Sequence, residues 1–175
     1  QITLDLKTLD DAKSFLGSKF QFEGIAYEPK IQEQKKFSKD ELATLVPLHK
    51  YWLDRNISLQ TIREFKGGVC MAGKMKSRYV FPIFSKNGDI IGFDGRDLTG
   101  RATAKWKKLG AKSKWLYPLS AEIKDTVILV ESMGCLLSLW EAGIKNVLVL
   151  FGTEVNLETL NFLLKIDPKK IIIAT

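Results

Sequence analysis

The chain has 175 residues, of which 45% are hydrophobic and 27% charged, so it is large and apolar enough to form a packed core. No apolar run approaches the ~20 residues of a membrane span and no secretory signal is visible, so we expect a cytoplasmic protein without a membrane partner. Two cysteines and one histidine cannot complete a zinc site, so a metal site in this chain has to be built from carboxylates.

The first third of the chain is predicted to be mainly helical. Apolar residues at helical spacing indicate a short helix within 6–16, and the polar stretch 28–37 is typical of a linker. Ser38 and Glu41 form a capping box, which predicts a helix through Leu45.

Two further short helices are predicted next in the chain. Pro47 suits the first turn of a helix that runs through Leu53. Ser58 is expected to cap another helix, which buries Ile62 and Phe65.

A β-hairpin is predicted after these helices. Residues 79–84 are rich in β-forming side chains, Asn87-Gly88 is a strong signal for a two-residue turn, and residues 90–93 supply the partner strand. Pro82 within the first strand indicates an edge position or a bulge. Residues 97–114 are rich in glycine and basic side chains, and no further strand is predicted there.

Basic charge is concentrated in residues 66–114, which carry twelve lysine and arginine residues and three aspartates, whereas the whole chain has a net charge of +7. Such a local basic field attracts polyanions, although a solvated lysine-rich surface has the same composition. Aromatic rings among the basic residues favour single-stranded nucleic acid, whose bases stack on them. Phe81 and Phe93 are better explained as hairpin core, whereas Trp106 lies between lysines and is harder to explain as core.

Residues 125–175 are predicted to form a β-α-β-α-β unit. Strands are expected at 126–130, 147–151 and 171–174, because each is a short, continuous apolar run. The helix between the first two strands has an inward stripe over residues 133–140, and the second helix is lined by leucines over 157–164. Alternating strands and helices favour a parallel, Rossmann-like sheet.

Glu131 is the strongest candidate for chemistry, because it directly follows the first buried strand of this unit and precedes a helix. Ligands of open α/β sheets gather beyond the carboxyl ends of the strands, where a carboxylate can bind Mg²⁺ or act as a general base. By position alone, an acid that is stabilised by the dipole of the following helix is the better explanation. Thr153 and Asn156 follow the second strand and are explained first as caps of the next helix.

Three stretches together resemble the catalytic core of DnaG-type DNA primases. Residues 51–58 resemble a small helical segment of the family. Residues 78–83 and 87–96 resemble its most specific signature, a strand with Phe-Pro-Ile, a turn, and Ile-Gly-Phe-x-Gly-Arg. Val130-Glu131, followed by a helix, a strand and Gly-Thr, resembles the first motif of a TOPRIM domain. The resemblance covers about residues 40–175.

The resemblance implies an α+β fold with three parts: a 1–37 extension that resembles the tail of a zinc-ribbon domain, a basic helical and β subdomain over 38–124, and the first half of a TOPRIM domain over 125–175. It implies that Glu131 is catalytic or holds a metal. It also implies that template and nucleotide phosphates are bound by five basic residues: Arg78, Arg96, Lys105, Lys107 and Lys112.

Several positions depart from the family pattern. Ser132 stands where the family has a glycine after the glutamate, and Cys135 stands where an aspartate often follows. The metal-binding aspartates of the family are expected beyond Thr175, and a zinc-binding domain is expected to precede the core. The Ser-Met-Gly sequence after Glu131 resembles a bacteriophage branch of the family.

The function implied by the resemblance is synthesis of short RNA primers on single-stranded DNA from NTPs, with Mg²⁺ or Mn²⁺, in the cytoplasm beside a replicative helicase. Two alternatives stay open. One is a TOPRIM nuclease or topoisomerase-like enzyme, although no tyrosine lies in a matching nucleophile context. The other is a non-catalytic module for single-stranded nucleic acid, which predicts binding that is indifferent to Mg²⁺.

Overall fold

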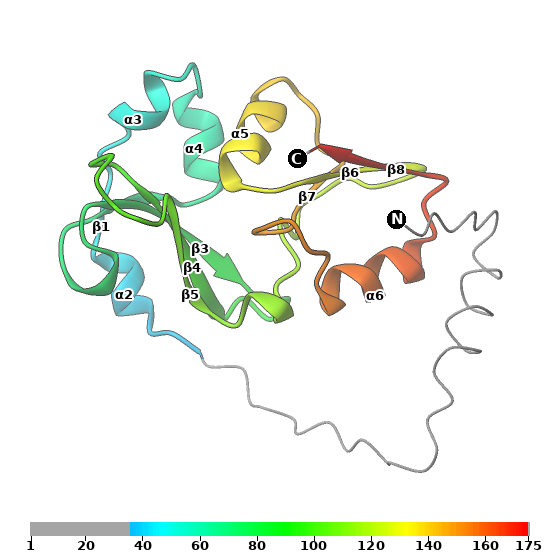
Figure 1. Ribbon diagram of the computed structural model, residues 1–175, viewed down its shortest axis with the longest axis horizontal. Coiled ribbons are helices and arrows are strands. Elements are labelled where there is room, and N and C mark those ends of the chain that lie inside the picture. Colours follow the sequence, from blue (N-terminus) through cyan, green and yellow to red (C-terminus); the bar gives the residue numbers. More distant parts are fainter. Residues whose placement is uncertain (1–35, 175) are drawn as a thin grey trace, which may run out of the picture. The chain divides into compact units, whose positions relative to one another are not determined.

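The computed structural model describes residues 36–174, which contain one antiparallel and one parallel β-sheet together with short helices (Figure 1). The first sheet is antiparallel with the strand order β1-β2-β3-β4-β5, and the second has the order β7-β6-β8. The predicted helix within 6–16 and nearly all of the linker predicted over 28–37 lie outside the described residues. None of the described helices is long and apolar enough to cross a membrane.

The capping box predicted at Ser38 is present at the start of α2, Lys39–Ala43. The backbone N–H of Ser38 donates to Oε2 of Glu41 at 3.0 Å. The helix does not continue through Leu45 as predicted, because Leu45–Val46 form strand β1, which pairs antiparallel with β2, Gly68–Cys70. Pairing with a distant strand overrides the local helical preference of this short segment.

Helices α3, Lys50–Leu53, and α4, Leu59–Glu64, follow β1. The first of them begins at Lys50 and not at Pro47, because the chain turns after β1, where the N–H of Leu48 donates to the carbonyl of Val46. The Oγ of Ser58 accepts from the N–H of Thr61 and caps α4 as predicted. The side chains that α4 is predicted to turn inward are buried: Ile62 and Phe65.

The predicted hairpin is formed by β3, Arg78–Phe84, and β4, Ile90–Asp97. Residues 85–89 connect the two strands, so the loop is longer than the two-residue turn that Asn87-Gly88 predicts. Tyr79 nevertheless lies opposite Arg96, which is the register that a two-residue turn sets.

A bulge reconciles this register with the longer loop. The pairing of β3 with β4 shifts between Ile83 and Phe84, so one extra residue enters the end of the hairpin. Pro82 lies just before this shift, beyond the part of β3 that pairs with β2, which covers only residues 78–80. Its missing N–H is therefore tolerated there, in agreement with the predicted edge position.

Strand β5, Trp106–Gly110, is not predicted by the sequence pattern, and it adds to the antiparallel sheet beside β4. Its lysine-rich residues lack a clean alternation of apolar and polar side chains. The strand forms because it pairs with Gly92–Arg96 of β4. A Cβ at Gly92 would lie 2.1 Å from Cζ2 of Trp115, so glycine leaves the space that this buried indole occupies.

The parallel β-α-β-α-β arrangement predicted for the C-terminal part is confirmed. Strand β6, Thr126–Val130, lies between β7, Val147–Val149, and β8, Lys170–Ala174, and both pairings are parallel. Helix α5, Met133–Glu141, connects β6 to β7, and α6, Leu157–Ile166, connects β7 to β8. The inward stripe predicted for α5 is buried: Met133, Leu136, Leu137 and Trp140.

The inward face predicted for α6 is confirmed at Leu163 and wrong at the other three leucines. Leu157, Leu160 and Leu164 are exposed by 63%, 45% and 52%, whereas Thr159 and Leu163 are buried. The cause lies at the helix start, where Asn156 caps α6 and its Nδ2 also donates to the carbonyls of Lys112 and Trp115. This anchoring fixes the rotation of α6 about its axis, so the stripe that contains Thr159 and Leu163 is buried.

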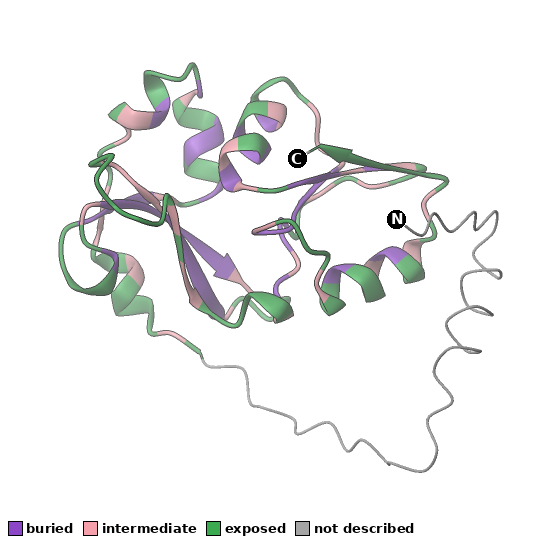
Figure 2. Cartoon of the chain, in the orientation of Figure 1, coloured by how far each residue is buried: buried purple, intermediate pink, exposed green. Residues whose placement is uncertain are grey.

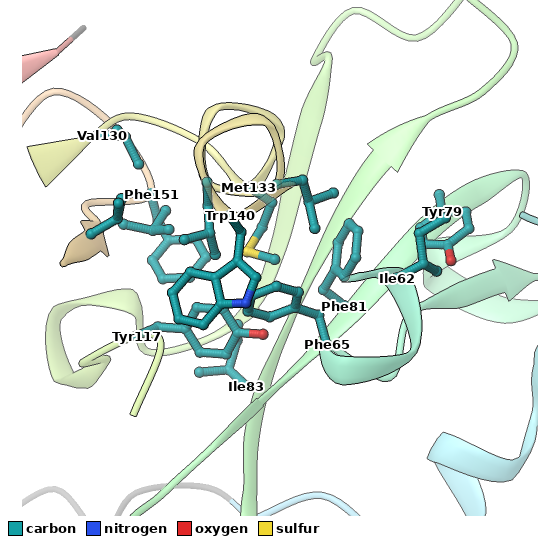
Figure 3. Packing of buried hydrophobic residues seen from close by; sticks show 14 of the residues in the cluster. Ile62, Phe65, Tyr79, Phe81, Ile83, Tyr117, Val130, Met133, Trp140 and Phe151 are labelled. Carbon is teal, nitrogen blue, oxygen red and sulfur yellow. The ribbon is translucent and has the colours of Figure 1, made fainter. Parts of the chain in front are cut away.

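The two sheets share one core, which we call the interface core. It contains Phe81 and Ile83 from β3, Val130 from β6 and Met133 from α5, and Figure 3 shows these side chains meeting between the sheets. A second core, built around Val80 and other residues, covers the opposite face of the antiparallel sheet. β3 and β4 are therefore buried over most of their length, whereas α6 is largely exposed (Figure 2). The change from the antiparallel to the parallel sheet falls near residue 125, although the division into domains stays a prediction.

Candidate nucleotide and nucleic-acid site

Glu131 lies at the carboxyl end of β6 with an exposed side chain. Its carbonyl accepts a hydrogen bond from the N–H of Gly152 at 3.0 Å, so the ends of β6 and β7 lie side by side. Helix α5 begins at Met133 with Ser132 as its N-cap residue, which places Glu131 outside the first turn. A negative charge directly before the N-cap is still favoured by the helix dipole, so dipole stabilisation stays an explanation for Glu131 beside a role in chemistry.

Lys112 approaches the same end of the parallel sheet. It belongs to the short 3-10 helix Lys112–Lys114, and a Cβ at Gly152 would lie only 3.2 Å from its Nζ. Because Gly152 also bonds to the backbone carbonyl of Glu131, the Lys112 ammonium lies near the strand ends from which Glu131 projects. The carbonyl of Lys112 accepts from Nδ2 of Asn156, so the cap of α6 holds this basic turn in place.

Arg96 and Trp106 lie next to each other across β4 and β5, on the face of the interface core. The guanidinium of Arg96 is 5.6 Å from the ring centroid of Trp106, and Trp106 stacks on Trp52 at 6.5 Å. A Cβ at Gly134, in the first turn of α5, would lie 3.8 Å from Cζ2 of Trp106. The basic and aromatic pair therefore borders the helix that follows Glu131.

Tyr51 connects Arg96 to a second arginine that the sequence analysis does not single out. The Nε of Arg96 donates to the Tyr51 hydroxyl at 2.9 Å, and the Arg55 guanidinium lies 3.7 Å from the Tyr51 ring centroid. Neither guanidinium has a carboxylate partner among residues 36–174. Arg55 was missed because it lies in a short helical segment, away from the basic stretch, where only its match to the family indicates a site.

Arg78 occupies a different position from Arg96. Its side chain is 8% exposed, and its Nη1 and Nη2 donate to the carbonyls of Gly95 and Ala104 at 3.1 and 3.0 Å. Its Cδ would lie 3.3 Å from a Cβ at Gly95, on the face of the sheet where Met75 also packs. The Arg78 guanidinium thus supports the segment before β5 from the face opposite Arg96.

The other two lysines of the predicted set also differ in position. The Nζ of Lys107 donates to the carbonyl of Lys74 at 2.9 Å, which directs it away from Arg96. Lys105 is exposed directly before β5, and its carbonyl accepts from the N–H of Asp97 at 2.9 Å. The structure therefore brings Glu131, Arg96 and Lys112 to one region, and the roles of all these residues stay predictions.

Asp94 is a buried carboxylate that the sequence analysis does not single out. It lies on β4, faces the interface core opposite Phe81, and is 1% exposed. Burial raises its pKa to about 7, while the charges of Lys108 and Arg78 act in the opposite direction. Its Oδ1 has no hydrogen-bond partner. The only sequence signal is an aspartate that follows the apolar first half of β4, between Phe93 and Gly95.

The described part of the chain contains few side chains that are grouped as metal ligands. Residues 36–174 contain no group of three or more histidine, cysteine or carboxylate side chains that could hold one. Glu131 can supply one carboxylate oxygen, which fits Mg²⁺, because this ion is commonly held by one or two carboxylates together with substrate phosphates.

Comparisons with known proteins agree with these observations. No family model matches the chain. The DNA primase of Clostridium acetobutylicum is 26% identical over 94% of this chain and 35% of its own length. The DNA primase of Borreliella burgdorferi is 33% identical over 65% of this chain and 24% of its own length. The chain thus spans about a third or less of the relatives it matches.

Solved structures show the same fold. A DnaG primase catalytic domain bound to single-stranded DNA superimposes with a TM-score of 0.60 at 21% identity, over 71% of this chain and 52% of that domain. The superimposed part of that DnaG domain contains both helices and strands, as this chain does. The chain is thus similar in sequence to part of bacterial DNA primases and has the fold of part of the DnaG catalytic domain.

Proposed function

We propose that this chain supplies the phosphate-binding surface and the catalytic glutamate of a DNA primase that synthesises RNA primers on single-stranded DNA. The observation that carries the proposal is the position of Glu131, an exposed carboxylate at the end of β6. The neighbouring strand end at Gly152 lies next to the Lys112 ammonium, and the helix that follows Glu131 borders Trp106, which pairs with Arg96. Similarity to primases over 94% of the chain supports the same conclusion.

Phosphate binding follows from the charges of this region. The guanidinium groups of Arg96 and Arg55 and the ammonium of Lys112 have no carboxylate partner among the described residues. A guanidinium can bind two phosphate oxygens at once, whereas an ammonium acts as a point charge. We propose that these groups hold the triphosphates of the NTPs and the backbone of the template. The solved DnaG domain bound to single-stranded DNA supports a template of this kind.

Chemistry is proposed to centre on Glu131. The reaction joins two NTPs by attack of a 3′-hydroxyl on an α-phosphorus, with pyrophosphate as the leaving group. We propose that Glu131 either accepts the proton of that hydroxyl or supplies one oxygen to a Mg²⁺ or Mn²⁺ ion. Such an ion stabilises the negative charge that develops on the phosphate oxygens. Further aspartate ligands beyond Thr175, a separate zinc-binding domain and a partner helicase stay predictions from the resemblance.

The decisive experiment is primer synthesis on single-stranded DNA with labelled NTPs and Mg²⁺, using the complete protein that the gene encodes. Glu131→Gln should lower synthesis by about 100-fold or more, because it removes the ionisable group and keeps its size. Glu158→Gln is the matched control, since Glu158 is an exposed glutamate in the first turn of α6. Synthesis that survives both Glu131→Gln and Lys112→Ala would refute the proposed site.

Other outcomes of the same experiment favour other functions. Metal-dependent cleavage of DNA without primer synthesis would indicate a TOPRIM nuclease. Salt-sensitive binding of single-stranded DNA with neither activity would indicate a non-catalytic binding module.

A further inference from the structure

Tyr51 lies between two arginines and contacts both of them. Its ring supports Arg55, whose guanidinium is 3.7 Å from the ring centroid and whose Nη1 donates to the Tyr51 carbonyl at 2.8 Å. Its hydroxyl accepts from Nε of Arg96 at 2.9 Å. The hydroxyl therefore bonds to Arg96 alone, whereas the ring lies near both guanidinium groups, at 3.7 Å from that of Arg55 and 5.8 Å from that of Arg96.

The bond to Tyr51 fixes how Arg96 presents its remaining donors. Nε is the donor nearest the aliphatic stem, so its hydrogen bond sets the rotation of the guanidinium plane. Nη1 and Nη2 have no hydrogen-bond acceptor among residues 36–174, and the guanidinium lies within 6 Å of the rings of both Tyr51 and Trp106. Two terminal amino groups held in one plane match two oxygens of a phosphate.

Core packing alone does not account for the hydroxyl. The Tyr51 ring packs edge-on against Trp52 with centroids 5.0 Å apart, and a phenylalanine ring would make the same contact. The polar part of the side chain is required only by Arg96. A substitution that removes only this oxygen therefore separates a positioning role from a packing role.

We propose that Tyr51 is a positioning residue whose hydroxyl orients Arg96 for bidentate binding of a phosphate group. The proposal rests on the proposed function, which makes Arg96 a phosphate ligand. The phosphate belongs either to an incoming NTP or to the template backbone, and the chemistry of recognition is the same for both.

A double-mutant cycle on the complete protein tests the proposal, with ATP in the presence of Mg²⁺ and a fluorescent single-stranded oligodeoxynucleotide as the two probes. Tyr51→Phe should weaken binding of at least one probe by about threefold to tenfold, as expected for loss of one hydrogen bond to a charged group. In the Arg96→Ala background the same substitution should have no further effect. The probe that loses affinity identifies the source of the phosphate.

Tyr79→Phe is the matched control, because it also removes one hydroxyl hydrogen bond, that between Tyr79 and Nδ1 of His49 at 2.7 Å. It should lower thermal stability without changing the affinity for either probe. Equal losses from Tyr51→Phe in the wild-type and Arg96→Ala backgrounds, or no loss with either probe, overturn the inference and leave the proposed function standing. A wild-type protein that binds neither probe overturns both.

Discussion

Substitution of Asp94 by asparagine should change how the stability of the chain depends on pH. Asp94 is buried at the interface core with one carboxylate oxygen lacking a hydrogen-bond partner, and its pKa is raised to about 7. The ionised form therefore opposes folding. At low pH the carboxyl is protonated in both the folded and the unfolded chain, so its ionisation does not change the free energy of unfolding. As pH rises from about 4 to about 7 the unfolded chain loses this proton first, and the free energy of unfolding falls.

The magnitude follows from the two pKa values. A rise from 3.8 to about 7 corresponds to about 4 kcal/mol of lost stability above pH 7, at 1.36 kcal/mol for each pH unit between them. This figure is an upper bound, because local rearrangement reduces the cost of the buried charge. An asparagine side chain has a similar shape and carries no charge at any pH in this range. The free energy of unfolding of the Asp94→Asn variant should therefore not show this fall between about pH 4 and about pH 7.

Urea denaturation followed by tryptophan fluorescence measures the effect between about pH 4.5 and about pH 8.5. The stability of Asp94→Asn relative to the wild type should rise across this range by up to about 3 kcal/mol, because the pKa of about 7 lies about 2.5 units above its lower end. Asp89→Asn is the matched control, because Asp89 lies in the loop of the same hairpin and forms an exposed ion pair with Lys36. A constant difference between Asp94→Asn and the wild type across the range would refute the reasoning.

Two further predictions test positions where side chains lie differently from the sequence-based expectation. Arg78→Lys should lower the free energy of unfolding by about 2 kcal/mol in urea denaturation, because lysine cannot bond to the carbonyls of Gly95 and Ala104 together. An unchanged stability would contradict the supporting role. Leu163→Ala should cost about 2–4 kcal/mol and Leu160→Ala less than about 0.5 kcal/mol, since only Leu163 is buried. The reverse order would contradict the described face of α6.

The features that the sequence predicted best are those fixed by neighbouring residues. β6 is one continuous apolar run, and Ser58 caps α4 through an oxygen and an N–H only three residues apart. Glu131 could be located because its place depends only on the strand before it and the helix after it. The turn at Asn87-Gly88 also predicts the register of the hairpin, even though a bulge lengthens the loop.

The features that could not be predicted depend on distant contacts. The strand β5 forms from lysine-rich residues because β4 offers it an edge, and the rotation of α6 depends on bonds from Asn156 to Lys112 and Trp115. The separation of Arg78 from Arg96 was within reach of the sequence. Side chains alternate between the two faces of a sheet, so the register of β3 and β4 places Arg78 and Arg96 on opposite faces. A prediction based on the number of basic residues in a stretch does not distinguish the two faces.

The position of β5 at the edge of its sheet has a consequence for solubility. An outermost strand exposes unpaired backbone groups, which can recruit the strand of another molecule and start aggregation. Lys107 and Lys108 lie on this strand, and bringing two such edges together would place like charges side by side. Lysines on this strand therefore keep separate molecules apart in addition to any contact with phosphates. Their replacement by neutral residues such as threonine would leave a strand edge that is free to pair with its own copies.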